Sequence, residues 1–159
     1  MKIKVGMGYD VHKFCEDKDL VLGGVNIPYA FGLKAHSDGD VLIHAICDAL
    51  LGAANMRDIG YHFPDNSDTY KDIDSKDLLS KVVSLIEVKD WNISNIDVTV
   101  ALQLPKLSPY IDKMKEVLAK VLKIDIEDIS IKATTTEKLG FEGRKEGVSA
   151  YAVALIIRD

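Results

Sequence analysis

The chain has 159 residues, of which 47% are hydrophobic and 28% are charged, the balance of one ordinary globular domain. It has no apolar run near the roughly 18 residues of a membrane span, and its N-terminus turns polar by residue 10, so no signal peptide is expected. Twenty basic and 25 acidic residues give a net charge of −5, which disfavours a broad nucleic-acid-binding surface. Cys15 and Cys47 form no CxxC pair and are typical of a reducing compartment.

The first strand is predicted from strict alternation between residues 3 and 12. One face carries apolar side chains, and the other carries Gly6, Gly8, Asp10 and His12. A short apolar run at residues 20–22 ends at two glycines and predicts a second strand or hairpin arm. We therefore expect the Asp10 and His12 side chains to point to the same side of a sheet.

Three helices are predicted from apolar side chains at helical spacing. The first spans about residues 38–55 and is capped by Ser37 or Asp38. The second begins at Ser75, and the third begins at Ser108, where proline follows. A connector from residue 58 to about 74 lies between the first two, and ordered loops of that length tend to be functional.

Further strands are predicted at residues 95–102, 129–133 and 148–157. The last is apolar on both faces, which is typical of a strand covered on both sides. Together these elements predict one domain, residues 1–159, of the α/β (α+β-like) class. We expect a four- to five-stranded mixed sheet with three helices on one face. The other face then needs a partner, which favours an oligomer whose sheets pack inward.

Asp10, His12 and His44 are candidate zinc ligands. A strand presents residues two apart to one point, and the first helix can bring a third ligand to it. Two histidines and one carboxylate leave a tetrahedral zinc ion with an open fourth position, as in catalytic sites. Asp40 lies one helical turn before His44, where a carboxylate can orient the imidazole. The alternative is a surface aspartate with two structural histidines.

Two polar segments are candidates for binding phosphate. His36 and Ser37 precede the first helix, whose free N–H groups can bind an anion, although an ordinary helix cap is the simpler explanation. The threonines at 134–136 offer hydroxyl groups to phosphate oxygens, and Glu137 offers an oxygen ligand to a cation such as Mg²⁺. This segment lacks P-loop spacing, and a threonine-rich turn is the alternative.

Five segments together resemble the 2-C-methyl-D-erythritol 2,4-cyclodiphosphate synthase family. They are Gly8–His12, Ala35–Val41, Asp58–Gly60, Phe63–Asp65 and Lys132–Phe141, and the resemblance runs from about residue 2 to residue 157. It implies a homotrimer of α/β subunits with active sites between neighbours. It also implies a phosphorus–oxygen lyase of the non-mevalonate (methylerythritol phosphate) isoprenoid pathway. Such an enzyme cyclises 4-diphosphocytidyl-2-C-methyl-D-erythritol 2-phosphate and releases CMP.

The resemblance also assigns roles to residues. Asp10, His12 and His44 hold zinc or another divalent metal, and Mg²⁺ or Mn²⁺ accompanies the substrate diphosphate near Glu137. His36, Ser37 and Thr135 orient the phosphates, with His36 and Thr135 as catalytic residues. Asp58 and Gly60 bind the ribose hydroxyls, and Phe63 and Asp65 border the methylerythritol pocket. The neighbouring subunit supplies the cytosine and diphosphate pocket, which is formed by Leu102, Pro105, Lys106, Leu107, Ser108 and Thr134. The rest of the expected substrate-binding set is Asp10, His12, Thr136, Glu137, Phe141 and Arg144.

Phe141, Arg144 and Glu146 resemble the residues that line the central cavity of the family's trimer. An isoprenoid diphosphate could bind there and regulate the enzyme. An ordinary turn with a surface ion pair is the alternative.

Two other functions remain open at this stage. A zinc-dependent phosphoesterase would use water as its nucleophile and give hydrolysis products. A non-enzymatic trimer that binds isoprenoid diphosphates or nucleotides would bind its ligand without turnover. We expect no nucleic-acid or membrane partner and a cytoplasmic location, although a plastid-type protein that has lost its transit peptide would have the same features.

Overall fold

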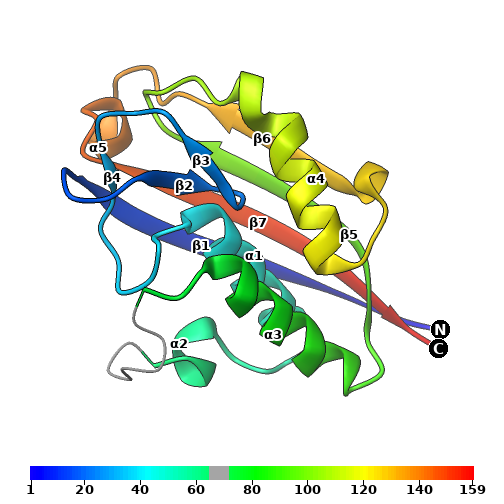
Figure 1. Ribbon diagram of the computed structural model, residues 1–159. Helices are drawn as coiled ribbons and strands as arrows, with labels where there is room; N and C mark the ends of the chain where they lie inside the picture. The colour runs from blue at the N-terminus through cyan, green and yellow to red at the C-terminus, as the bar shows by residue number, and fades with distance from the viewer. Residues whose placement is uncertain (65–71) are drawn as a thin grey trace.

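A five-stranded mixed sheet forms the centre of the computed structural model, which describes residues 1–64 and 72–159 (Figure 1). The sheet order is β4-β1-β7-β5-β6, with antiparallel β1–β7 and β5–β7 pairs and a parallel β5–β6 pair. A two-stranded hairpin of β2 and β3 lies apart from it. The predicted sheet is confirmed, with five strands. The strands are β1 (Lys2–Cys15), β2 (Leu20–Leu22), β3 (Val25–Ile27), β4 (Gly32–Leu33), β5 (Asn92–Ala101), β6 (Ile129–Thr134) and β7 (Gly147–Arg158).

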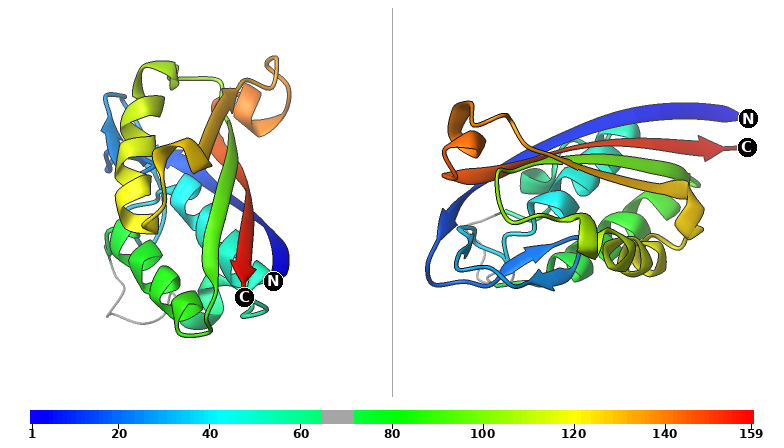
Figure 2. Two further views of the ribbon diagram at one scale, coloured as in Figure 1. Left: turned by 90° about the vertical axis from the view of Figure 1, so that its right-hand side faces the viewer. Right: turned by 90° about the horizontal axis from the view of Figure 1, so that it is seen from above.

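The three long helices lie on one side of the sheet, as predicted (Figure 2). The first begins at Val41 rather than near residue 38, because Asp40 and neither Ser37 nor Asp38 is its N-cap. None of the described helices is long and apolar enough to cross a bilayer. The helices are α1 (Val41–Ala53), α2 (Ile59–His62), α3 (Ser75–Glu87), α4 (Ile111–Leu122) and α5 (Gly140–Gly143), with short 3₁₀ turns at Ser108–Tyr110 and Ile126–Asp128.

Helix α1 is buried on nearly all sides between the sheet and α3. A helix that is apolar all round needs such a position. Gly6 and Gly8 of β1 allow its close approach, since a Cβ atom at either position would lie 2.0 Å from a carbonyl oxygen of α1. The oxygen facing Gly8 belongs to Ala45, the residue after His44. The glycines therefore set the distance between α1 and the strand that carries Asp10.

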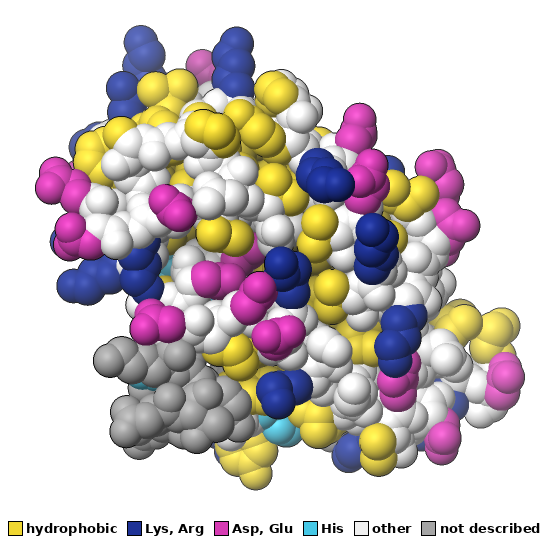
Figure 3. Space-filling view, viewed as in Figure 1, with side chains coloured by type: hydrophobic (Ala, Val, Ile, Leu, Met, Phe, Trp, Pro, Cys, Tyr) yellow, Lys and Arg dark blue, Asp and Glu magenta, His cyan; other side chains and the backbone are white. Residues whose placement is uncertain are grey.

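The apolar face of β1 is the exposed face of this chain. The side chains of Ile3, Val5 and Met7 are 57%, 67% and 62% exposed, and Tyr151 and Val153 of the adjoining β7 are each 43% exposed. No helix or strand within residues 1–64 and 72–159 covers this face (Figure 2). The opposite, helix-bearing face has interspersed acidic and basic side chains (Figure 3). A continuous stripe of exposed apolar side chains is typical of a surface that binds another protein or another copy of the chain.

Candidate functional site

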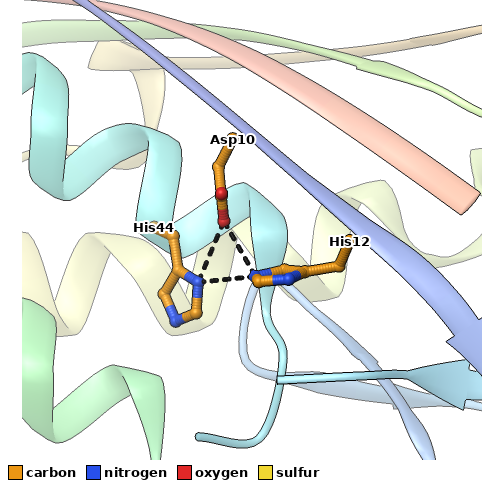
Figure 4. Close-up of side chains that lie close together, drawn as sticks. All are labelled: Asp10, His12 and His44. Carbon is orange, nitrogen blue, oxygen red and sulfur yellow. Dashed lines mark hydrogen bonds and ion pairs between the residues drawn. The ribbon is translucent and has the colours of Figure 1, made fainter. Parts of the chain in front are cut away.

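Asp10, His12 and His44 converge on one point between β1 and α1 (Figure 4). The Oδ2 atom of Asp10 lies 2.9 Å from Nε2 of His12 and 3.0 Å from Nδ1 of His44. The two ring nitrogens are 3.1 Å apart. The alternation of β1 brings the first two side chains to one face, and the close packing of α1 adds the third.

The donor set fits a divalent metal ion. Hydrogen bonds alone satisfy the cluster poorly, because two ring N–H groups that both donate to Asp10 would face each other across 3.1 Å. Ligands at 2.0–2.1 Å from a tetrahedral zinc ion lie about 3.3 Å from one another, close to the spacing found here. The three residues predicted as metal ligands therefore form a group that could hold a metal ion.

The electrostatics of the cluster favour a charged carboxylate. Burial raises the pKa of Asp10, but hydrogen bonds and charge from His12 and His44 outweigh it and bring the pKa well below its usual value. For His44, burial lowers the pKa, but the hydrogen bond and charge of Asp10, with the charges of Asp40 and Asp38, together raise it by more, so the net pKa lies above the usual value. The site is thus set up to hold positive charge beside Asp10.

The interpretation of Asp40 as the hydrogen-bonding partner that orients His44 is wrong. Both oxygens of its fully buried carboxylate accept hydrogen bonds from backbone N–H groups: those of Gly23 at 3.0 Å, Gly24 at 2.7 Å and Ile43 at 3.0 Å. Burial raises the pKa of Asp40 to about 6, so the carboxyl group is largely ionised at neutral pH. Asp40 therefore ties the β2–β3 hairpin to the start of α1.

Replacing Asp40 by alanine should destabilise the protein by about 3 kcal/mol or more, because three buried N–H groups lose their acceptor. Denaturant unfolding measures this change. Asp74→Ala is the matched control, since Asp74 caps α3 through an exposed bond to the N–H of Lys76 and should cost only about 1 kcal/mol. Equal losses in the two variants would contradict the role given to Asp40.

His44 binds two serines through its other ring nitrogen. Its Nε2 lies 3.0 Å from Oγ of Ser75 and 3.2 Å from Oγ of Ser37. Ser75 donates its hydroxyl proton to Asp38. The roles of Ser75 and Asp38 were not predicted from the sequence, because 31 residues separate Ser75 from His44 and no periodic pattern connects a helix start to the middle of another helix.

A cavity of about 220 Å³ opens beside the cluster. Lys18 fixes one wall, since its Nζ donates to the carbonyl oxygens of Ala35 at 2.9 Å and Ser37 at 2.7 Å. The role of Lys18 was also not predicted from the sequence. Asp58 is the N-cap residue of α2, whose residues Ile59 and Gly60 line the cavity, and Asp65 lies outside the described residues. The complete lining is Asp10, His12, Ala35, His36, Ser37, His44, Ile59, Gly60, Phe63, Ile73 and Leu78.

The remaining predicted residues lie elsewhere on the chain. A second cavity, of about 150 Å³, has Thr135 in its lining. Thr136 and Glu137 come directly after Thr135 in the chain and lead into an exposed turn, in which Glu137 has a positive φ of 53°. Arg144 and Glu146 form an exposed ion pair with two hydrogen bonds, of 2.9 and 3.2 Å. No described residue lines both cavities. The second is lined by Leu102, Gln103, Pro105, Lys106, Leu107, Ser108, Ala133, Thr134 and Thr135.

The sequence of the chain matches a known protein family over nearly its whole length. The model of the YgbB family matches residues 3–157, nearly the whole chain. The chain belongs to the YgbB family. A relative from Bacteroides fragilis, named 2-C-methyl-D-erythritol 2,4-cyclodiphosphate synthase, is 63% identical over 158 residues, which are 99% of each chain. A relative of the same name from Bacteroides thetaiotaomicron is 60% identical over the full length of both chains. The resemblance drawn from the sequence segments is confirmed.

Solved structures of related proteins have the same fold. The bifunctional IspDF from Campylobacter jejuni superimposes with a TM-score of 0.94 at 44% identity, over 98% of this chain and 42% of that one. A CDP complex of IspF from Plasmodium falciparum gives a TM-score of 0.86 at 39% identity, over 99% of this chain and 97% of that one. The similarity in fold therefore agrees with the family membership that the sequence shows.

Proposed function

We propose that the protein is a 2-C-methyl-D-erythritol 2,4-cyclodiphosphate synthase of the methylerythritol phosphate pathway, with residues 1–159 as one catalytic domain. Its substrate is 4-diphosphocytidyl-2-C-methyl-D-erythritol 2-phosphate, and its products are the 2,4-cyclodiphosphate and CMP. One observation carries the proposal: the Asp10, His12 and His44 cluster beside a cavity, in a chain whose curated relatives are named for this reaction. The two free cysteines agree with a cytoplasmic location.

The chemistry needs no nucleophile from the protein. An oxygen of the substrate's 2-phosphate attacks the β-phosphorus, and the bond from that phosphorus to the oxygen shared with the α-phosphate breaks. CMP leaves with the electron pair, so the enzyme is a phosphorus–oxygen lyase and water is not a reactant. Positioning and charge stabilisation then account for most of the catalysis. His36, Ser37 and Thr135 are the proposed donors to the phosphate oxygens, with His36 and Thr135 as the catalytic pair.

Two metal ions are part of the proposal. Asp10, His12 and His44 would hold zinc, which their mixed nitrogen and oxygen donors suit. When bound there, the ion supplies Lewis-acid polarisation of a phosphate oxygen. Glu137 is the proposed ligand of the Mg²⁺ or Mn²⁺ that accompanies the diphosphate, because a carboxylate suits a hard cation.

We propose a homotrimer with active sites between neighbouring subunits. The exposed apolar face of β1 and β7 supports it, since no described residue of the chain covers this face. The division of the predicted residues between two cavities also supports it, because one subunit's second cavity could face another subunit's metal cluster. In that assembly Leu102–Ser108 and Thr134 would bind cytosine and diphosphate, and Asp58 and Gly60 would bind ribose. Phe63 would border the methylerythritol group, and Phe141, Arg144 and Glu146 would line a central cavity for an isoprenoid diphosphate.

A charge on the exposed face should break the trimer. Val5→Lys is expected to reduce the solution mass from three times 17.5 kDa to that of one chain, because the lysine would be buried at an apolar interface. Light scattering after size exclusion measures the mass. Val88→Lys is the matched control, since Val88 is 84% exposed at the end of α3, away from this face. A Val5→Lys protein that stays trimeric would contradict the proposed interface.

The deciding experiment follows the reaction by phosphorus NMR. The purified protein is incubated with the cytidine substrate and Mg²⁺, beside a chelator-treated sample. We expect CMP and the two coupled resonances of a cyclic diphosphate, with neither in the chelated sample. CMP with an open-chain bisphosphate would instead favour a phosphoesterase. No turnover by trimeric protein that contains zinc would favour a binding protein; the names of the relatives favour neither alternative.

A further inference from the structure

The second ring nitrogen of His44 lies in a polar pocket away from the metal-binding side. Its Nε2 lies 3.0 Å from Oγ of Ser75, the first residue of α3. Ser75 is fully buried, and His44 is only 8% exposed. This contact joins α1 to α3 behind the cluster, where water competes poorly.

The direction of the hydrogen bonds around Ser75 follows from counting protons. A serine hydroxyl carries one proton, and Ser75 donates it to the Asp38 carboxylate. Asp38 is held in place because it also accepts the backbone N–H groups of Ser75 at 2.9 Å and Asp40 at 3.1 Å. The Ser75 oxygen therefore offers only a lone pair to His44. Nε2 must carry a proton to make this bond, which leaves the Nδ1 lone pair to face Asp10 and His12.

We propose that Ser75, fixed by Asp38, is a positioning residue that accepts the Nε2–H of His44 and so presents Nδ1 to the metal. The inference rests on the metal site of the proposed function and adds residues that act through a ligand without touching the ion. Partners of this kind fix the tautomer and the ring orientation of a metal-binding histidine. Ser37 is a second, more distant acceptor at 3.2 Å, so loss of Ser75 should weaken binding without abolishing it.

The first test is the zinc affinity of Ser75→Ala, measured by competition with a chromophoric chelator. We expect the affinity to fall about 10- to 100-fold, the usual effect of removing such a partner. The start of α3 is retained, because the backbone N–H of residue 75 still reaches Asp38. Ser84→Ala is the matched control, since the Ser84 hydroxyl donates to the carbonyl oxygen of Ser80 within α3, and the zinc affinity of this variant should not change.

A second variant tests the direction of the bond with Ser75 in place. In Asp38→Asn the side-chain amide can donate to the Ser75 oxygen, which turns the serine proton toward Nε2. Zinc affinity should fall about as far as in Ser75→Ala. In ¹⁵N spectra of the zinc-loaded parent, the His44 Nε2–H proton should exchange slowly with water, and in Ser75→Ala it should exchange rapidly.

Zinc affinities within a factor of two of the parent for both variants would overturn the inference, as would a His44 Nε2–H that stays protected in Ser75→Ala. A parent protein that binds no zinc would instead refute the metal site of the proposed function. The two failures are therefore distinguishable in the same experiment.

Discussion

Replacing His44 by alanine is expected to remove both the bound metal and the cyclisation activity. The parent should copurify with about one zinc ion per chain, because its three donor atoms lie within 3.1 Å of one another. The variant keeps only two of them. We expect kcat to fall about 10³-fold or more, since a catalytic metal supplies several kcal/mol of charge stabilisation. Elemental analysis measures the metal, and phosphorus NMR measures the activity.

The control must separate loss of a ligand from loss of the fold. Circular dichroism and a thermal melt of His44→Ala should show a folded protein, and His12→Ala, at the more exposed of the two histidines, should repeat the loss of metal. His62→Ala controls for the removal of a histidine, because His62 bonds the carbonyl oxygen of Met56 outside the cluster and should leave the zinc content unchanged. A His44→Ala protein that kept one zinc ion per chain would show that the ligand assignment is wrong.

Gly8→Ala should be among the most damaging small substitutions in the sheet. The added Cβ would lie 2.0 Å from the carbonyl oxygen of Ala45 and 2.7 Å from the amide nitrogen of Ala49. Both contacts are to backbone, so no side chain can rotate away. We expect the free energy of unfolding to fall by about 3 kcal/mol or more, at the upper end of overpacking effects. Denaturant unfolding at one fixed protein concentration measures it.

The same substitution should weaken the metal site. Gly8 lies two residues before Asp10, and Ala45 follows His44, so a shift of α1 away from β1 separates the ligands. Gly52→Ala is the matched control within α1: its Cβ would meet nothing within 4 Å, and alanine in a helix interior should add about 0.5–1 kcal/mol of stability. A Gly8→Ala protein with the stability and zinc affinity of the parent would contradict this account of the packing.

Much of this protein could be predicted from local patterns. Alternation along β1 predicts that Asp10 and His12 share a face, because successive side chains of a strand point to opposite sides. The helical spacing of apolar residues predicts α3 from Ser75 and the helix that carries His44. These patterns, with the family resemblance, were enough to name the three candidate metal ligands.

How these elements meet depends on long-range packing, which local patterns do not encode. Periodicity defines the faces of an element but not what covers them, so the apolar side of β1 is exposed in one chain while the side with Gly6 and Gly8 packs on α1. Asp40 was misread for the same reason: its partners in the β2–β3 hairpin lie 16 and 17 residues away. Ser75 reaches His44 because α3 packs across α1. Long-range contacts of this kind depend on packing in three dimensions, which no local spacing in the sequence encodes.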